Sequence, residues 1–545
     1  MRIRVLSLAI VALFGVLALG LAGLSLVSGR KFRELSDKNC IRLIPQSGSR
    51  GKIIDANGKT IVSSILSYDV LVLPQGFAAM QRTFDGLAGI IAIDGEELMG
   101  RFRRSYTEPS VPVVVARNIG LEKALAIEER KLDLDGIIVQ TNVVRFYPYA
   151  NLAAHVIGYL SEIDRWRLTK LADYGYKTRD IVGVGGIEER YDYYLRQEDG
   201  GLSVEVDHQG RFSRILGYCP PRNGQDIGLT VDVRVQRIVE DALDGYRGSI
   251  VVMDPATGAI IAMASRPDFD PALFVKKGPA RSFAALFNDP AAPMTNRAIH
   301  GGYPPGSVFK PIVAACALEL GRANPATTHV CPGFLAVGRR RFKCWNTHHE
   351  VDLIEAIAQS CDVYFYKTGL ASGARNLHDY AVKLGLGRVS GIELPYEEAG
   401  LVPDPLWRRL TRFQRWYDGD TANFAIGQGE LLVTPLQIVR MTAVFANGGN
   451  LVTPYLVRSI GANDVSMSHR KVLRLGFKKK NIDAVREGLR QVVASPRGTA
   501  NILADVGVAV AGKTGTAEAP GRGTHAWFSG FFPYERPRYC FCVFL

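Results

Sequence analysis

The chain has 545 residues, of which 47% are hydrophobic and 22% are charged. That length excludes a small protein with one ordinary core, so two or three globular domains are expected. The formal net charge of +13 is spread over the whole chain, so it indicates an anionic partner only weakly. No nucleic-acid partner is predicted.

The first apolar segment predicts a membrane anchor. Residues 5–27 (VLSLAIVALFGVLALGLAGLSLV) contain no charge, and as a helix they would be about 34 Å long, enough to cross a bilayer. A cleavable signal peptide is the alternative, because Arg2 and Arg4 form a basic start. Basic residues also follow the segment, so charge leaves its orientation open.

A turn-forming cluster at residues 220–224 (PPRNG) marks a domain boundary. The predicted division is an anchor over residues 1–28, a mixed α/β domain over 29–225 and a third domain over 226–545. In the middle domain, Asn57-Gly58 separates two apolar runs and predicts a tight hairpin. This domain contains no convincing catalytic set.

The third domain begins with two predicted strands, 249–253 and 259–264, joined by the turn DPATG. Further predicted elements are helices at 308–320, 353–370 and 482–493, and strands at 506–516 and 526–532. Strands at both ends with helices between them indicate an α+β domain, whose sheet is closed by segments far apart in the sequence.

Ser307 is the candidate nucleophile. Pro304-Pro305-Gly306 ends the preceding segment, and Ser307 to Lys310 begin an apolar helix. Three residues are about one helical turn, so the hydroxyl and the amine are expected on one face. A neutral lysine can serve as the base that such a serine needs. Because lysine is normally protonated, a second lysine is expected nearby to favour the neutral form.

The Ser-x-x-Lys spacing alone is a weak signal, because it recurs at Ser28/Lys31, Ser49/Lys52 and Ser468/Lys471. A second element, Ser360-Cys361-Asp362, falls inside the predicted helix 353–370. Its hydroxyl and carboxylate could relay a proton and orient a lysine. Ordinary helix-end chemistry is the alternative for this tripeptide.

A third element, Lys513-Thr514-Gly515-Thr516, ends the apolar run VGVAVAG. Lys513 supplies positive charge, and the threonine hydroxyls can hold a carboxylate. Gly515 would let a substrate backbone approach the strand. The similar tripeptide Lys367-Thr368-Gly369 lies within a predicted helix, which is the wrong context.

These three elements occur in the order typical of penicillin-binding proteins and serine β-lactamases. Over nearly its whole length, the chain resembles the class B penicillin-binding proteins, most of all the elongation transpeptidases of the penicillin-binding protein 2 group. The stretches that carry the resemblance are SRGKIIDANGK (49–59), RFYPYANLAAHVIGYL (145–160), GVGGIEERYD (183–192), VVMDPATGAIIAMASRPDFDP (251–271), NRAI before YPPGSVFK, GQGELLVTP (427–435) and AGKTGTAE (511–518).

The resemblance implies a peptidoglycan D,D-transpeptidase that cross-links stem peptides during cell elongation and is acylated by β-lactam antibiotics. Ser307 would form the acyl-enzyme and Lys310 would take its proton, with Ser360 and Asp362 assisting. Lys513, Thr514 and Thr516 would hold the substrate carboxylate, and the backbone N–H groups of Ser307 and Thr516 would form the oxyanion hole. The amine of a second stem peptide would then resolve the ester.

The resemblance also implies an architecture and a location. A transpeptidase domain with an antiparallel sheet flanked by helices would follow a pedestal domain of the penicillin-binding protein dimerisation type. The chain would be a single-pass protein of the bacterial inner membrane, with its catalytic domain in the periplasm. Its partners would be a membrane-embedded glycan polymerase and proteins of the rod-shape complex. The chemistry would require no cofactor.

Three features depart from the family pattern. Asp362 stands where many relatives have Asn, and Ala56 replaces the usual Arg of the first pedestal motif. Relatives continue beyond the strand-like run RYCFCVFL through more strand and a final helix. The transpeptidase domain is therefore expected to be truncated at Leu545, with an apolar sheet face uncovered.

The chain has eight cysteines and nine histidines. Three of the cysteines and one histidine form the pattern C-x12-C-x3-H-x12-C: Cys331, Cys344, His348 and Cys361. Three thiolates and an imidazole suit a closed tetrahedral zinc site. A Cys331-Cys344 disulfide and unlinked buried thiols are the alternatives, because the spacing is irregular for a zinc motif. A zinc ion here would fix the second catalytic element in place.

Other functions remain open. A β-lactam sensor would be acylated without turnover, a D,D-carboxypeptidase or β-lactamase would use water as the acceptor, and an inactive truncated chain could serve as a scaffold for a glycan polymerase. The pedestal residues Tyr147, Gly183 and Glu188 favour a synthase over a sensor. No separate deacylation base is evident.

Overall fold

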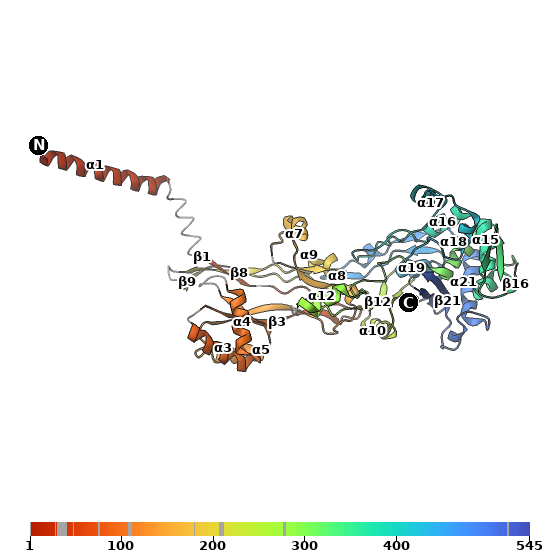
Figure 1. Ribbon diagram of the computed structural model, residues 1–545, viewed down its shortest axis with the longest axis horizontal. Coiled ribbons are helices and arrows are strands. Elements are labelled where there is room, and N and C mark those ends of the chain that lie inside the picture. The colour runs from red at the N-terminus through yellow and green to blue at the C-terminus, as the bar shows by residue number, and fades with distance from the viewer. Residues whose placement is uncertain are drawn as a thin grey trace. The chain divides into compact units, whose positions relative to one another are not determined.

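The computed structural model describes residues 2–27, 29, 41–46, 48–74, 77–106, 112–178, 180–206, 212–275, 280–519 and 523–545 (Figure 1). The chain divides into two compact units. Unit 1 contains residues 1–50, 66–143 and 196–224, and unit 2 contains residues 51–65, 144–195 and 225–545.

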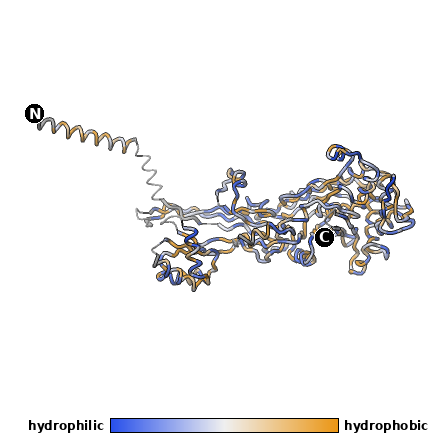
Figure 2. Tube along the Cα trace, viewed as in Figure 1, coloured by the Kyte–Doolittle hydropathy of each residue, from blue (hydrophilic) through white to orange (hydrophobic). Residues whose placement is uncertain are grey.

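Unit 1 begins with the helix α1 (Arg2–Ala22), which continues as a π-helical turn over Gly23–Val27. Among the described residues, the stretch Leu6–Leu26 is the one helix that is long and apolar enough to cross a membrane, and none of its side chains is buried. Figure 2 shows the apolar character of α1 along its length. The helix fits the predicted single-pass anchor.

The rest of unit 1 has a small core between helices and strands. Buried side chains come from β4 (Val113–Ile119) and from those parts of β3 (Thr60–Val72) and β5 (Ile137–Phe146) that belong to this unit. Helices α3 (Phe77–Ile91), α4 (Gly95–Ser105) and α5 (Leu121–Glu129) contribute the others. The antiparallel order β1-β8-β9 forms a separate sheet, from Ile41–Gln46, Gly200–Val206 and Phe212–Cys219.

Unit 2 is built on a five-stranded antiparallel sheet in the order β12-β11-β23-β22-β21. Its strands are Gly248–Met253 (β11), Ile260–Arg266 (β12), Ala511–Ala519 (β21), Gly523–Phe532 (β22) and Tyr539–Phe544 (β23). The first two strands and the last three are separated by about half of the chain. The predicted α+β class and the predicted closure of the sheet by distant segments are confirmed.

Among the described helical elements of residues 225–545, four contact this sheet: α10 (Val233–Ala242), the 3-10 turn η3 (Gly306–Phe309), α19 (Pro435–Ala446) and α21 (Lys479–Ala494). The other helical elements in this part of unit 2 are α11 (Ala272–Val275), α12 (Ala280–Asn288), α13 (Lys310–Glu319), α14 (Leu353–Ala358), α15 (Asp362–Ser372), α16 (Ala374–Lys383), α17 (Pro405–Thr411), α18 (Asp418–Ala425), α20 (Ser466–His469) and the 3-10 turn η4 (Asn501–Leu503). Helix α13 is buried on nearly every side, as expected for the central helix of a large core.

The remaining elements of unit 2 are short. They are β2 (Ile53–Ile54), α6 (Ala154–Ile157), β6 (Tyr159–Glu162), α7 (Arg165–Leu171), the 3-10 turn η2 (Ala172–Tyr174), β7 (Ile181–Val184), α8 (Gly186–Arg190), α9 (Asp192–Leu195), β10 (Ile227–Leu229), β13 (His329–Cys331), β14 (Phe334–Val337), β15 (Arg340–Lys343), β16 (His349–Val351), β17 (Asn450–Val452), β18 (Val457–Ile460), β19 (Asn463–Asp464) and β20 (Val472–Arg474). The predicted hairpin at Asn57-Gly58 is confirmed, because it joins β2 to β3, with Gly58 at a φ of 82°.

Two predicted elements differ from the structure. The predicted helix 353–370 is interrupted between α14 and α15, where Ser360 has a φ of 55°. The predicted strand 506–516 begins only at Ala511, because that residue pairs with Phe531, next to the end of β22. Residues before Ala511 have no strand partner there.

Candidate active site

A groove of about 880 Å³ brings the three predicted elements together. Its lining includes Ser307, Ser360 and Asp362, and Thr514 to Thr516. These segments come from η3, from the break between α14 and α15, and from the edge strand β21. The two predicted lysines lie beneath this surface, with Lys310 fully buried and Lys513 2% exposed.

The turn η3 aligns Ser307 with Lys310. The Lys310 N–H donates to the Ser307 carbonyl, which is the i to i+3 pattern of a 3-10 helix. In that geometry side chains three residues apart lie one above the other. The Ser307 side chain is partly exposed in the groove, while that of Lys310 points into the core.

Lys310 is the centre of a buried polar cluster. Its ammonium donates to the Ser360 carbonyl at 2.8 Å, to the Ser360 hydroxyl at 3.0 Å and to Asp362 Oδ1 at 2.7 Å. An ammonium has three protons, so Ser360 and Asp362 together engage all of them. This arrangement satisfies a fully buried charge, which would otherwise be very costly.

The break in the predicted helix makes these contacts possible. A carbonyl inside a helix is used by the helix itself, whereas the Ser360 carbonyl is free to accept from Lys310 and from Trp345 Nε1, at 3.3 Å. A non-glycine residue at positive φ is strained. Contacts from two directions therefore hold Ser360 in a conformation that the local sequence disfavours.

Lys513 lies close enough to Lys310 for their charges to interact. Burial lowers the pKa of Lys513 well below its ordinary value, and the neighbouring Lys310 charge lowers it further, while Asp362 opposes the shift. Lys310 contacts Asp362 directly, whereas Lys513 donates to the Thr514 carbonyl at 3.1 Å. The second lysine expected near Lys310 is therefore present, and one proton of this cluster is held weakly.

Strand β21 forms one wall of the groove. The hydroxyls of Thr514 and Thr499 lie 2.6 Å apart, and Thr516 is exposed. A Cβ at Gly515 would lie 3.0 Å from the Pro305 carbonyl and 3.0 Å from Val308. The structure therefore adds a second reason for this glycine, which is close packing of β21 against η3.

Several lining residues were not singled out from the sequence. They are Lys343, Trp345, Tyr366, Asn423, Ile426, Gln428, Gly429, Thr499, Glu518 and Thr524. Gln428 and Gly429 belong to the stretch GQGELLVTP, which contributed to the resemblance but was not predicted to belong to the site. Glu518 likewise ends the stretch AGKTGTAE. The others come from strands, helices and loops without a motif, so only the fold brings them to the groove.

The four residues of the cysteine-histidine pattern also converge. Their sulfur and nitrogen atoms all lie within 4.8 Å of one another. His348 Nδ1 lies 3.6 Å from Cys331 Sγ and 3.5 Å from Cys344 Sγ. The three cysteines are free thiols in this structure, so the Cys331-Cys344 disulfide is not formed.

This cysteine-histidine cluster touches the second predicted element, Ser360-Cys361-Asp362. The Asp362 N–H donates to Cys344 Sγ at 3.2 Å, and Cys361 Sγ accepts from the Tyr364 N–H at the start of α15. A hydrogen bond from Cys361 lowers the pKa of Cys344 to about 5. The same hydrogen bond, with burial, raises the pKa of Cys361. Cys344 is therefore suited to be a thiolate.

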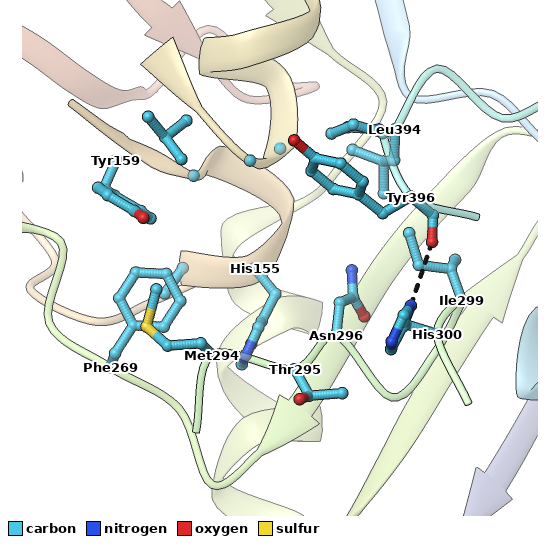
Figure 3. Close-up of a pocket in the computed structure, with 16 residues that line it drawn as sticks. His155, Tyr159, Phe269, Met294, Thr295, Asn296, Ile299, His300, Leu394 and Tyr396 are labelled. Atoms are coloured by element: carbon cyan, nitrogen blue, oxygen red, sulfur yellow. Dashed lines mark hydrogen bonds between the residues drawn. The ribbon is translucent and has the colours of Figure 1, made fainter. Parts of the chain in front are cut away.

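A second cavity, of about 240 Å³, has a different character (Figure 3). Tyr159, Phe269 and Tyr396 contribute rings to its lining, and His155 lies beside them. Burial lowers the pKa of His155 to about 4, and its Nε2 lies 2.7 Å from the Pro293 carbonyl. Among the described residues, no lysine, serine or carboxylate lines this cavity, so the groove is the better candidate for catalysis.

The family model for the penicillin binding protein transpeptidase domain matches residues 248–545, more than half of the chain. The chain belongs to this family. A second model, for the penicillin-binding protein dimerisation domain, matches residues 45–229. The predicted family is confirmed.

Relatives extend the match over the full length. The peptidoglycan D,D-transpeptidase MrdA of Escherichia coli (strain K12) is 32% identical, over 100% of this chain and 90% of that protein. The complex between penicillin-binding protein (PBP2) and MreC from Helicobacter pylori contains a chain with a TM-score of 0.80 and 29% identity, covering 92% of this chain and 95% of that one. These likenesses support the predicted transpeptidase function.

A third relative comes from a structure on polymerization and crosslinking by a peptidoglycan synthase complex. Its TM-score is 0.78 at 30% identity, and the match covers 100% of this chain and 94% of that one. The structural relatives thus include a chain in complex with MreC and a chain of a synthase complex.

Proposed function

We propose that this transpeptidase works through a serine acyl-enzyme formed on Ser307 at the groove. The convergence of η3, the α14–α15 break and β21 around one partly exposed hydroxyl carries this proposal. The D-alanyl-D-alanine end of a stem peptide would lie along β21. Ser307 Oγ would attack the penultimate carbonyl, and the terminal D-alanine would leave. The amine of a second stem peptide would then attack the ester and regenerate the hydroxyl.

Lys310 is the proposed base. It follows Ser307 by one turn of η3, and the three groups that accept its protons fix the position of its ammonium. Burial and the neighbouring Lys310 charge lower the pKa of Lys513, so Lys513 gives up its proton more readily than an exposed lysine would. A substrate carboxylate held near Lys513 would stabilise the charge on that lysine. Lys310 would then be the lysine left to take the Ser307 proton.

Strand β21 and the start of η3 are proposed to hold the substrate. Thr514 and Thr516 would bind the terminal carboxylate, with positive charge from Lys513 beneath them. The backbone N–H groups of Ser307 and Thr516 would form the oxyanion hole, which in other acyl-transfer enzymes contributes on the order of 3 to 4 kcal/mol per donor. Penicillin-type antibiotics would enter by the same route and remain as stable esters.

Labelling with a fluorescent penicillin tests this proposal. The full chain in detergent is incubated with the reagent beside Ser307→Ala, and the labelled peptide is mapped. We expect one labelled peptide containing Ser307 and no label in the variant. Ser49→Ala is the matched control, because it removes a serine that also has a lysine three residues on. Label that survives Ser307→Ala would refute the nucleophile.

We further propose that the cysteine-histidine cluster holds a structural zinc ion. With Zn–S near 2.3 Å and Zn–N near 2.0 to 2.1 Å, a tetrahedral site has an S to N edge of about 3.6 Å. The two S to N distances here, 3.6 and 3.5 Å, fit that edge. Cys331, Cys344, His348 and Cys361 would be the ligands. The bound ion would join β13, the loop after β15 and the start of α15.

Metal analysis of the purified full chain tests the zinc site. One zinc ion per chain is expected, and Cys344→Ala should lower that ratio strongly. Cys219→Ala is the control, because Cys219 is an exposed free thiol outside the cluster. If protein purified without chelator contains almost no zinc per chain, the cysteines are better explained as unlinked thiols.

The location and partners of the chain are also proposed. The body of the protein would face the periplasm of a bacterium, with α1 in the inner membrane, because its substrate is assembled outside that membrane. By likeness to the relatives found with MreC and in a synthase complex, its partners would be a rod-shape complex protein and a membrane-embedded glycan polymerase. Protease accessibility in sealed spheroplasts tests the orientation: added protease should degrade the body, and protection would contradict it.

A further inference from the structure

The second cavity, of about 240 Å³, lies apart from the groove, and we call it the aromatic pocket (Figure 3). Among the described residues, the linings of the two spaces have no residue in common. The aromatic pocket is lined by residues from the segments 154–159, 184–186, 294–300 and 394–396, and by Phe269. In another protein an engineered apolar cavity of about 150 Å³ binds benzene. The aromatic pocket is therefore large enough for a small molecule with fused rings.

Two glycines keep one wall of this pocket free of side chains. Gly158 follows α6 with a φ of 84°, and a Cβ there would lie 2.1 Å from the Gly185 carbonyl oxygen. A Cβ at Gly186 would lie 2.4 Å from the Ile157 carbonyl carbon. The backbone segments pack too closely for larger residues at either position. The hollow is therefore a fixed part of the fold.

Aromatic rings supply much of the remaining lining. The rings of His155 and Tyr159 meet Phe269 edge to face, with centroids 5.3 and 5.8 Å apart. Tyr159 is also stacked on Phe274 at 3.8 Å. Such contacts hold the rings in defined orientations. In the described part of the chain, no Lys, Arg, Asp or Glu side chain lines the pocket, so it suits a neutral, flat ligand.

His155 provides one polar atom for such a ligand. Burial lowers the pKa of His155 to about 4, so the ring is neutral at physiological pH. Its Nε2 lies 2.7 Å from the Pro293 carbonyl. Because a carbonyl can only accept, Nε2 carries the proton and Nδ1 is left as an acceptor. Nδ1 has no hydrogen-bond partner within the described residues, so a ligand that donates a hydrogen bond would complete it.

Tyr396 lies at the rim of the pocket. It contributes to the lining although 62% of it is exposed. Its hydroxyl donates to Glu189 Oε1 at 2.9 Å, and its carbonyl lies 3.4 Å from His300 Nδ1. A φ of 64° is unfavourable for a tyrosine, so these contacts hold it in a strained position. A ring fixed at the rim leaves room for a small molecule more readily than for a loop of a partner protein.

We propose that the aromatic pocket binds a small neutral molecule with a flat ring system and one hydrogen-bond donor. The rings would lie against Tyr159 and Phe269, and the donor would point to His155 Nδ1. A carboxylate or an ammonium would find no opposite charge in the described lining, so charged molecules are disfavoured. The inference goes beyond the proposed function and does not depend on it, because the groove contributes no residue to this site.

Two probes of nearly equal shape test the proposal. Indole has an N–H donor, and benzofuran has an oxygen in its place. Binding to the full chain in lipid nanodiscs is measured by equilibrium dialysis, with empty nanodiscs to correct for uptake by the lipid. Indole is expected to bind about fivefold more tightly than benzofuran, as one neutral hydrogen bond would give. Equal binding of the two probes, or binding of neither, would overturn the proposal.

Variants assign the preference to the pocket. His155→Phe keeps a ring but removes the acceptor, so indole and benzofuran should bind equally. His378→Phe is the control, because His378 is also half-buried but does not line the pocket, and it should keep the fivefold preference. A preference that persists in folded His155→Phe would contradict the assigned acceptor.

A filling variant keeps the test decisive if His155→Phe does not fold, since that variant also loses the contact with Pro293. Met294→Trp places a ring in the pocket from its own lining and should weaken the binding of both probes at least tenfold. Circular dichroism checks the fold. Undiminished binding in folded Met294→Trp would locate the probes elsewhere and overturn the site. Tighter binding of N-acetyltryptophanamide than of indole would replace the small molecule with a side chain of a partner protein.

Discussion

Two buried polar clusters meet at the tripeptide Ser360-Cys361-Asp362. The cluster that we propose to be catalytic consists of Lys310, Ser360, Asp362 and Lys513, and we call it the catalytic cluster. The cysteine-histidine cluster consists of Cys331, Cys344, His348 and Cys361. Lys310 finds all its hydrogen-bond partners within the chain. In the second cluster, the buried His348 Nε2 has no partner among the described residues, and the thiols mainly face one another and a ring nitrogen.

This difference shows how the two clusters depend on each other. The chain completes the catalytic cluster by itself, through charge and hydrogen bonds. The cysteine-histidine cluster has the donor set of a metal site, so an ion would complete it. Because Cys344 holds the Asp362 N–H, the metal site would position the carboxylate that orients Lys310. Substitutions in each cluster can therefore separate proton transfer by the first cluster from structural support by the second.

The largest effect is expected from Lys310→Ala. The substitution leaves Ser307 without its base and Asp362 without its cation, so the rate of penicillin labelling should fall about 1,000-fold, within the range for a lost general base. Lys367→Ala is the matched control, because Lys367 lies in the misplaced Lys-Thr-Gly tripeptide. Stopped-flow labelling measures the rate, and circular dichroism confirms that the variant folds. An unchanged labelling rate would show that Lys310 is not the base for Ser307.

A smaller effect is expected from Cys344→Ala. Loss of a metal ligand or its support commonly costs 10- to 100-fold in affinity or activity, so labelling should slow by about tenfold while Ser307 remains the labelled residue. A chelator should lower the thermal midpoint of the wild type toward that of the variant. Cys219→Ala should behave like the wild type. If chelator leaves the wild-type midpoint unchanged, the second cluster does not support the first through a metal.

The comparison also shows what sequence could predict. The apolar anchor, the hairpin at Asn57-Gly58 and most strands of the five-stranded sheet follow from local patterns of hydrophobicity and turn residues. The residue types of both clusters were predicted as well, because each chemistry uses few side chains. These features depend on short segments, and the structure brings the predicted segments together.

The break at Ser360 could not be predicted in this way. The segment 353–370 has a helical pattern, and a serine at positive φ is locally unfavourable. The contacts that offset the strain come from Lys310, 50 residues earlier, and from Trp345. The first residue of β21 could not be predicted either, because it depends on where β22 ends.

The smallest effect concerns the pH dependence of stability. Burial and Lys310 lower the pKa of Lys513 in the folded chain, so between that lowered value and the ordinary value of about 10.5 the unfolded state binds more protons. Stability should therefore rise with pH in this window, by at most about 1.4 kcal/mol per pH unit from this group. Lys513→Met removes the contribution, and Lys480→Met, at an exposed position, retains it.

Thermal unfolding of the three proteins between pH 7.5 and 9.5 measures this difference. The midpoint of the wild type minus that of Lys513→Met should become more positive as the pH rises, whereas the difference between the wild type and Lys480→Met should stay constant. A difference that falls with pH would mean that Lys513 keeps its proton more firmly when folded. The charge of Asp362 would then outweigh burial, and the catalytic cluster would hold its protons too tightly to supply a base.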